Sequence, residues 1–269
     1  MTDEPPPEGG SSASGPQPLR LDLAYDGTSF HGFAENDGVR TVAGELRRAL
    51  ETVTGVPVEL TCAGRTDRGV HARAQVVTVR FPEGAPSPRR ADDPTSLRNS
   101  LVALLAPEIV VAGVRPAATD FDARFSARSR TYRYQVWNAE VPSPFLDRTA
   151  WWVDEPLDLP SMDLAAGALV GEHDFSTFCR RPRGTPEVSL VRRVLAAGWS
   201  RPEDELLRFE ISATAFCHQM VRSIVGLLVE VGRGRRDPAD VARALEARDR
   251  AALPTLAPPR GLVLWDVGY

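Results

Sequence analysis

The 269-residue sequence contains no lysine, so all 32 of its basic residues are arginines. Cysteine and histidine are also scarce, with three and four copies. Three cysteines without a C-x-x-C pair predict no disulfide framework, and they favour a reducing, cytoplasmic location. The four histidines form no H-x-x-x-H pattern, so we expect no metal centre; they are His31, His71, His173 and His218.

Long apolar runs are absent as well. The most apolar stretch, "MVRSIVGLLVEVG", is too short to cross a bilayer and contains Arg222 and Glu230, so we expect no membrane association. Residues 1–18 consist mainly of Pro, Gly, Ser and acid, which predicts a disordered tail. This tail lacks the basic start and apolar run of a signal peptide.

The net charge of −4, taken alone, argues against nucleic acid as a partner. The distribution of charge argues for it, because much of the acid lies in the tail and in segments such as "VDEPLDLPSMD", while arginines cluster elsewhere. The planar guanidinium group of arginine suits phosphate and stacks on bases. Local clusters govern binding more than the total charge does, so the sequence is compatible with an RNA-binding surface.

Hydrophobic periodicity predicts the same order of elements, β-α-β-β-α-β, in both halves of the chain. In the first half we expect strands at Leu19–Tyr25, Val58–Cys62, Gln75–Phe81 and Ile109–Val114, a helix from the Thr41 cap to Gly55, and a helix carrying Leu97, Leu101, Leu104 and Leu105. In the second half we expect strands at Thr131–Trp137, Val191–Trp199, Leu206–Ala213 and Leu262–Val267, a helix from a Ser161 cap through Leu169, and helices at Phe216–Val231 and Pro238–Ala247.

This repeat predicts an α+β protein built of two ferredoxin-like halves, 19–117 and 118–269. Their antiparallel sheets are expected to be joined, with a central active-site cleft. A fold of this kind does not by itself give a function.

Asp67 is the acid that the sequence singles out. It lies in "GRTDRG" between Arg65 and Arg68, with Gly64 and Gly69 on either flank. Taken alone, this hexamer is typical of a hairpin turn. Guanidinium neighbours also stabilise an ionised carboxylate, which suits a nucleophile or a base better than a proton donor. A turn that is also a reaction site satisfies both interpretations.

Two arginine-rich stretches surround this motif in the sequence. In "RFSARSRTYRYQVW", Tyr132 and Tyr134 share one strand face and Arg133 lies opposite. The stretch is either an edge strand with a solvated basic face or a basic groove with an aromatic side chain for base stacking. "FCRRPRGTPEVSLVRR" is a second basic loop, typical of solvated surface and compatible with an RNA face.

Arg222 lies in the apolar part of its helix, where a buried arginine needs an acidic partner. The ordinary explanation is a structural salt bridge. If the partner is Asp67, the structural and the chemical roles coincide. Nearby Cys217 and His218 are interpreted as core residues.

Six segments together resemble the tRNA pseudouridine synthase A family over nearly the whole chain after the tail. In chain order they are "YDGTSFHGF", "AGRTDRGVHA", "FDARFSARSRTYRY", "GEHDFSTF", "FCHQMVRSIVGLLVEVGRG" and "APPRGLVLWDVGY". The resemblance implies isomerisation of uridine to pseudouridine at positions 38, 39 and 40 of the tRNA anticodon stem-loop. It also implies a homodimer that binds tRNA and uses no cofactor and no metal.

The resemblance assigns roles to five residues. Asp67 matches the acid that attacks the target uridine, and Arg222 matches the arginine that pairs with it. Arg65 matches an arginine that helps to evert the nucleotide. Tyr132 matches the tyrosine that stacks on the base, and Leu262 matches an apolar wall of the pocket.

The sequence departs from the family pattern at a few positions outside the catalytic acid. The first motif continues with Phe33 and Ala34, where the family usually has Trp and Gln. Arg68 stands in place of a small residue, and Ser223 replaces an expected Asn. These changes bear on RNA contacts and on which uridines are chosen.

Two other functions compete with this interpretation. "LDLAYDGTSF" superficially resembles the nucleophile motif of a magnesium-dependent phosphatase, but that motif needs a second acid where Thr28 follows Asp26. A non-catalytic RNA-binding protein explains the arginines and Tyr132. It does not explain a carboxylate at the centre of a basic surface, because an acid placed against phosphates weakens binding.

Overall fold

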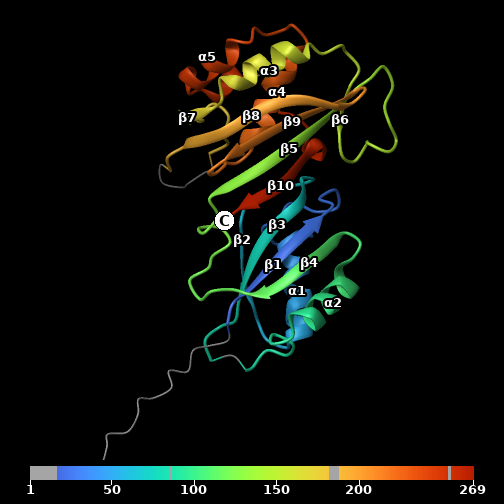
Figure 1. Cartoon of the computed structure of the whole chain (residues 1–269), viewed down its shortest axis with the longest axis vertical. Coiled ribbons are helices and arrows are strands. Elements are labelled where there is room, and N and C mark those ends of the chain that lie inside the picture. The colour runs from blue at the N-terminus through green and yellow to red at the C-terminus, as the bar shows by residue number, and fades with distance from the viewer. Residues whose placement is uncertain (1–16, 85, 182–187, 254–255) are drawn as a thin grey trace, which may run out of the picture.

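The computed structural model describes residues 17–84, 86–181, 188–253 and 256–269, so most of the predicted tail and the centre of the second basic loop lie outside the described residues. Within the described residues, ten strands form one sheet, with helices packed against it (Figure 1). The predicted α+β class with joined, mostly antiparallel sheets is confirmed.

The first half of the chain follows the predicted order of elements. These are β1 (Leu19–Tyr25), α1 (Val42–Thr54), β2 (Glu59–Cys62), β3 (His71–Arg80), α2 (Pro94–Leu105) and β4 (Ile109–Pro116). Burial alternates along β1, as the apolar pattern predicts. Helix α1 begins after Thr41, whose hydroxyl accepts the Gly44 N–H, and ends at Gly55 in the left-handed conformation.

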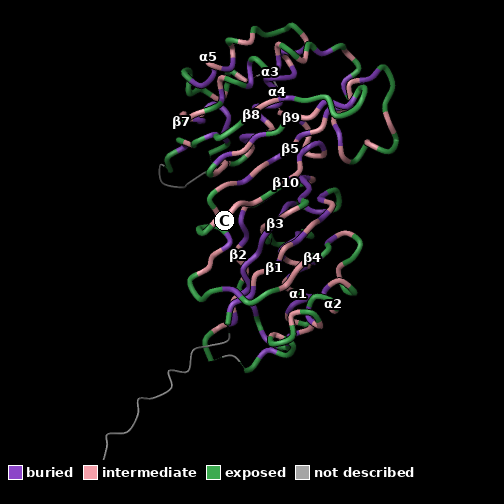
Figure 2. Tube along the Cα trace, in the orientation of Figure 1, coloured by how far each residue is buried: buried purple, intermediate pink, exposed green. Residues whose placement is uncertain are grey.

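The second half contains the predicted elements and two short strands that the sequence pattern did not predict, β6 and β7. Its elements are β5 (Ser129–Asn138), β6 (Trp151–Val153), α3 (Leu159–Gly167), β7 (Gly171–Asp174), β8 (Val191–Glu203), β9 (Leu206–Ala213), α4 (Met220–Gly232), α5 (Asp240–Ala247) and β10 (Leu262–Gly268). Two single-turn 3₁₀ helices precede β10, at Arg250–Ala252 and Pro259–Gly261. Helix α4 is buried along most of its length (Figure 2).

Strand β10 joins the two halves of the sheet. The strand order is β4-β1-β3-β10-β5-β9-β8-β7, with β2 on β3 and β6 on β5. Figure 1 shows β10 between β3 and β5. β10 is antiparallel to β5 and parallel to β3, where Val263 pairs with His71 and Leu264 with Ala72. The junction of the two halves is therefore held by backbone pairing.

Three local predictions are wrong. Asp158 rather than Ser161 caps α3, since the Asp158 carboxylate accepts the Ser161 N–H. Helix α4 begins at Met220 rather than Phe216, because Gln219 has a φ of 66° and a left-handed residue cannot lie inside a right-handed helix. The edge-strand interpretation of β5 is also wrong, since β5 pairs with β10 on one side and β9 on the other.

The cysteines also differ from the prediction. Cys179 and Cys217 form a disulfide, with Cα atoms 5.7 Å apart and a sequence separation of 38. The sequence alone does not reveal this pair, because folding brings two distant segments together. Cys62 is free and buried. In the part of the chain that the structure describes, no helix has both the length and the apolar character that crossing a membrane requires.

Candidate active site

A cavity of about 970 Å³ lies where the two halves meet. Its lining includes the five residues named as site residues from the sequence, which come from four different segments. Arg65 and Asp67 lie on the loop between β2 and β3, Tyr132 on β5, Arg222 on α4, and Leu262 at the start of β10. Residues far apart in the sequence thus converge on one hollow.

Hydrogen bonds hold the loop that leads into Asp67. The Thr66 hydroxyl shares a hydrogen bond of 2.8 Å with the buried Tyr25 hydroxyl, and the Thr66 carbonyl accepts the Phe33 N–H at 3.0 Å. Two residues earlier, the Gly64 carbonyl accepts a hydrogen bond of 2.6 Å from the fully buried amide of Gln75. The loop is therefore fixed before any substrate arrives, which favours catalysis by a preorganised group.

Each carboxylate oxygen of Asp67 has a nitrogen-bearing neighbour. Arg222 Nη1 donates to Oδ2 at 3.3 Å, and His218 Nε2 lies 3.4 Å from Oδ1. Among the described residues, these two form the ion pairs of Asp67 within 4.0 Å; its sequence neighbours Arg65 and Arg68 do not. The guanidinium group nearest to the acid thus comes from a residue 155 positions away.

Arg222 is itself well positioned. Its side chain is 12% exposed, and its Nε donates to the Ala257 carbonyl at 2.8 Å. Asp67 is 22% exposed, so the pair is largely shielded from water yet opens into the cavity. The guanidinium group of Arg222 therefore fixes one carboxylate oxygen of Asp67 at the edge of the cavity.

Tyr132 contributes an aromatic wall. The residue is 7% exposed, and its ring meets Phe216 edge to face with centroids 5.0 Å apart. Burial raises the pKa of Tyr132, and nearby Tyr25 and Asp67 raise it further. The phenol therefore stays protonated at neutral pH and offers a neutral ring face.

Arg130 has a role that the sequence interpretation missed. It belongs to the stretch "RFSARSRTYRYQVW", interpreted as a solvated basic face or a basic groove, but it is 8% exposed and donates hydrogen bonds to backbone carbonyls. Burial lowers the pKa of its guanidinium. The strand alternation contains the relevant signal, since Arg130 shares the face of Tyr132 and Tyr134, which is the buried one.

The interpretation of His218 as a core residue is wrong, whereas Cys217 packs against the hydrophobic core. His218 is 43% exposed in its side chain and lines the cavity, and Cys217 is only partly buried and also lines it. The error follows from the misplaced start of α4, because a loop residue was assigned to a buried helix. A histidine four positions before Arg222 was the available signal.

The acid of the rival phosphatase motif is part of a turn. Asp26 Oδ1 accepts hydrogen bonds from the Thr28 amide at 2.9 Å and the Thr28 hydroxyl at 2.6 Å. Burial alone raises the pKa of Asp26, but these bonds and the neighbouring His71 and Arg148 leave it below its usual value. Asp26 does not line the cavity that contains Asp67. Within the described ranges, no group of three or more acidic, His or Cys residues is arranged to hold a metal ion.

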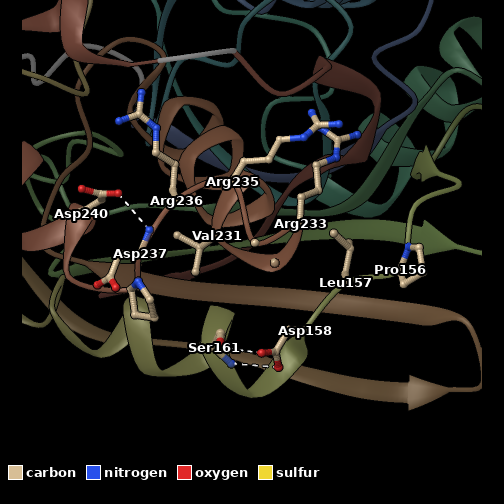
Figure 3. A pocket seen from close by; sticks show the side chains of 13 residues that line it. Pro156, Leu157, Asp158, Ser161, Val231, Arg233, Arg235, Arg236, Asp237 and Asp240 are labelled. Atoms are coloured by element: carbon tan, nitrogen blue, oxygen red, sulfur yellow. Dashed lines mark hydrogen bonds between the residues drawn. The ribbon is translucent and has the colours of Figure 1, made fainter.

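A second hollow of about 900 Å³ lies at the far end of α4 (Figure 3). The guanidinium groups of Arg233 and Arg235 come together there and pair with Glu155 and Glu230. Most of its positive charge is thus balanced within the protein, and the five predicted site residues lie elsewhere. We therefore place the candidate active site in the cavity around Asp67.

The cavity thus brings together a paired acid, a buried tyrosine and several arginines, an arrangement that suits a reaction site. Comparison with known proteins agrees with the motifs. Residues 23–126 and 165–269 match the family described as tRNA pseudouridine synthase. The chain belongs to this family, as the motifs of the sequence predict.

Curated relatives are similar over most of their length. The chain is 44% identical to the tRNA pseudouridine synthase A of Frankia casuarinae, covering 93% of this chain and 89% of the relative. It is 39% identical to that of Leifsonia xyli, with 93% and 91% coverage, and 41% identical to that of Corynebacterium glutamicum, with 93% and 89%. Among solved structures, one chain in the crystal structure of a Cbf5-Nop10-Gar1 complex is 12% identical, covering 78% of this chain and 45% of that one. Its TM-score of 0.31 is too low to support an argument.

Proposed function

We propose that this protein isomerises uridine to pseudouridine at positions 38, 39 and 40 of the tRNA anticodon stem-loop, with Asp67 as the nucleophile. The observation that carries this proposal is the setting of Asp67. Its carboxylate opens into the cavity, and Arg222 and His218 lie against its two oxygens. Family membership supports the reaction class, and this geometry supports Asp67 as the acid that performs it.

The reaction breaks the bond from uracil N1 to the sugar and forms a bond from C5 to the same sugar carbon. One proton leaves C5 and N1 gains one, so the product is an isomer and no electrons are transferred. The balance requires no redox cofactor, and we propose from the family resemblance that no metal or other cofactor takes part. The target base must first leave its stack, which costs a few kcal/mol.

The neighbouring side chains suit the remaining steps. The ring of Tyr132 provides a face on which the everted base stacks, and Leu262 closes the apolar side. Arg65 is exposed on the same loop as Asp67. There it occupies the position that the everted nucleotide leaves, or binds the phosphate of that nucleotide. Arg222 orients the carboxylate through its hydrogen bond to Oδ2.

We extend the proposal to the organisation of the molecule. The strand orders β4-β1-β3-β2 and β10-β5-β9-β8 support two ferredoxin-like halves, 19–117 and 118–269. The family resemblance supports a homodimer, which extends the arginine surface along a long RNA substrate. A tRNA substrate supports a cytoplasmic location.

The test is release of tritium from tRNA that carries C5-labelled uridine, in buffer with EDTA. We expect release by the wild type and none by Asp67→Asn, with pseudouridine mapped to positions 38, 39 and 40 by primer extension after carbodiimide treatment. Asp26→Asn is the matched control, because it removes the rival acid and should leave release intact. Full release by Asp67→Asn would remove Asp67 as the nucleophile, and an inert wild type would remove the activity.

A further inference from the structure

The backbone that carries His218 is tied to a neighbouring segment at two consecutive residues. Cys217 is disulfide-bonded to Cys179, and the His218 carbonyl accepts a hydrogen bond of 2.9 Å from the Arg180 N–H. These two links fasten the loop before α4 to the chain after β7. These links restrain the backbone at His218, although 43% of the His218 side chain is exposed.

The next residue adds a third constraint. Gln219 has a φ of 66°, a conformation that few non-glycine residues adopt unless the surrounding structure imposes it. Its side-chain oxygen accepts a hydrogen bond of 2.7 Å from Arg250. The left-handed Gln219 places His218 in the loop before α4, while Arg222 lies in the first turn of that helix. The two side chains, four residues apart, both contact Asp67.

Arg222 and His218 each contact a different oxygen of the Asp67 carboxylate. Arg222 Nη1 lies 3.3 Å from Oδ2 and His218 Nε2 lies 3.4 Å from Oδ1. The terminal torsion of an aspartate is broad, so one partner on one oxygen leaves the group free to rotate about its own axis. A second polar group against the other oxygen, the His218 nitrogen at 3.4 Å, restricts that rotation.

We propose that His218 is a positioning residue for Asp67, an inference that rests on the proposed function. Its imidazole holds Oδ1 while Arg222 holds Oδ2, and together they present the carboxylate to the uridine in one orientation. Correct orientation of a reacting group accounts for a large part of a rate enhancement, and a small misplacement lowers the rate by up to about a hundredfold. His218 therefore acts on the chemical step through Asp67 rather than on tRNA affinity.

The test compares two substitutions that differ in hydrogen-bonding capacity. His218→Phe keeps an aromatic ring and removes both ring nitrogens, whereas His218→Gln keeps a polar donor of similar reach. We expect the single-turnover rate of tritium release to fall about 10- to 100-fold in His218→Phe and to recover to within about fivefold of wild type in His218→Gln. The Kd for tRNA should change by less than about twofold in both variants, since contacts to phosphate dominate binding.

His173→Phe is the matched control, because His173 lies on β7 and is not part of the cavity lining. It should retain the wild-type rate. A melting temperature for each variant excludes loss of the fold, and His218→Leu with His218→Asn repeats the comparison if the first pair is unstable. A wild-type rate in His218→Phe, a parallel loss of rate and tRNA affinity, or a glutamine variant as slow as the phenylalanine one would each overturn the inference.

The outcome is separable from that of the proposed function. An inert wild type removes the function itself. A wild type that is active, an Asp67→Asn variant that is not, and a fully active His218→Phe variant leave the function in place and remove only the role of His218.

Discussion

Replacing Arg130 with methionine should destabilise the fold and disturb the Asp67 loop together. The guanidinium group makes five hydrogen bonds of 2.5 to 3.1 Å to the carbonyls of Ala63, Arg124, Ala127 and Thr214. Ala63 precedes the GRTD motif and receives two of these bonds, from Nε and Nη2. The substitution therefore leaves several buried acceptors without a donor.

The magnitude follows from two opposing contributions. A hydrogen bond from a charged donor contributes about 1.5–3 kcal/mol, but the sum overstates the loss, because burying the guanidinium is itself unfavourable. A buried acceptor left without a donor costs about 1–3 kcal/mol, so several orphaned carbonyls, less the burial cost of the guanidinium, give a net loss of about 3–5 kcal/mol. At about 2–4 °C per kcal/mol for a protein of this size, the melting temperature should fall by about 10 °C.

Differential scanning calorimetry measures this fall, and tritium release by the folded variant measures the effect on the loop. Arg128→Met is the matched control, because Arg128 lies two residues away and is exposed. The control should stay within about 0.5 kcal/mol of wild type. A loss of less than about 1 kcal/mol in Arg130→Met would refute the structural role that we assign to this arginine.

Three further predictions concern Cys62, Tyr132 and Asp174. Burial raises the pKa of the Cys62 thiol to about 11. At pH 8 a thiol reagent should therefore label no cysteine in the native protein and one cysteine after unfolding without reductant. Three labelled cysteines in the unfolded, unreduced protein would contradict the disulfide. Tyr132→Ala should lose turnover far more than tRNA binding, and equal losses would count against base stacking. Hydrogen bonds from Ser176 hold the pKa of Asp174 below its usual value. The stabilising effect of Asp174 is therefore present above pH ~4 and lost as pH falls through the folded-state pKa. Asp174→Asn should melt at a lower temperature than wild type at pH 7 and at the same temperature at pH 2, and an equal difference at both pH values would contradict this.

Local patterns predicted what local interactions determine. The Thr41 cap and the Gly55 end of α1 depend on side chains and glycine conformations within one turn, and both are as expected. Alternation in β1 and β5 identified the strands, because each buries one face. The motif residues of the cavity were identifiable because each lies in a segment that resembles a known family.

Tertiary contacts determined what the sequence did not reveal. The start of α4 depends on the left-handed Gln219, and the apolar stretch hid the break. The pairing of Cys179 with Cys217 depends on a contact between the segment after β7 and the loop before α4. The position of His218 beside Asp67 depends on both features. A helix predicted from Phe216 includes His218, so the sequence pattern did not predict that His218 lies in the cavity.

The position of Asp67 at the junction between the halves has a consequence for how the site forms. The acid belongs to the first half, whereas Arg222 and the apolar wall at Leu262 belong to the second. Arg222 is in turn held by Ala257, since its Nε donates to the Ala257 carbonyl and its own carbonyl accepts the Ala257 N–H at 3.2 Å. Ala257 lies just before β10, the strand that pairs with both halves. Because the same segment orients the arginine and closes the sheet, the acid acquires its partner only when the two halves are joined.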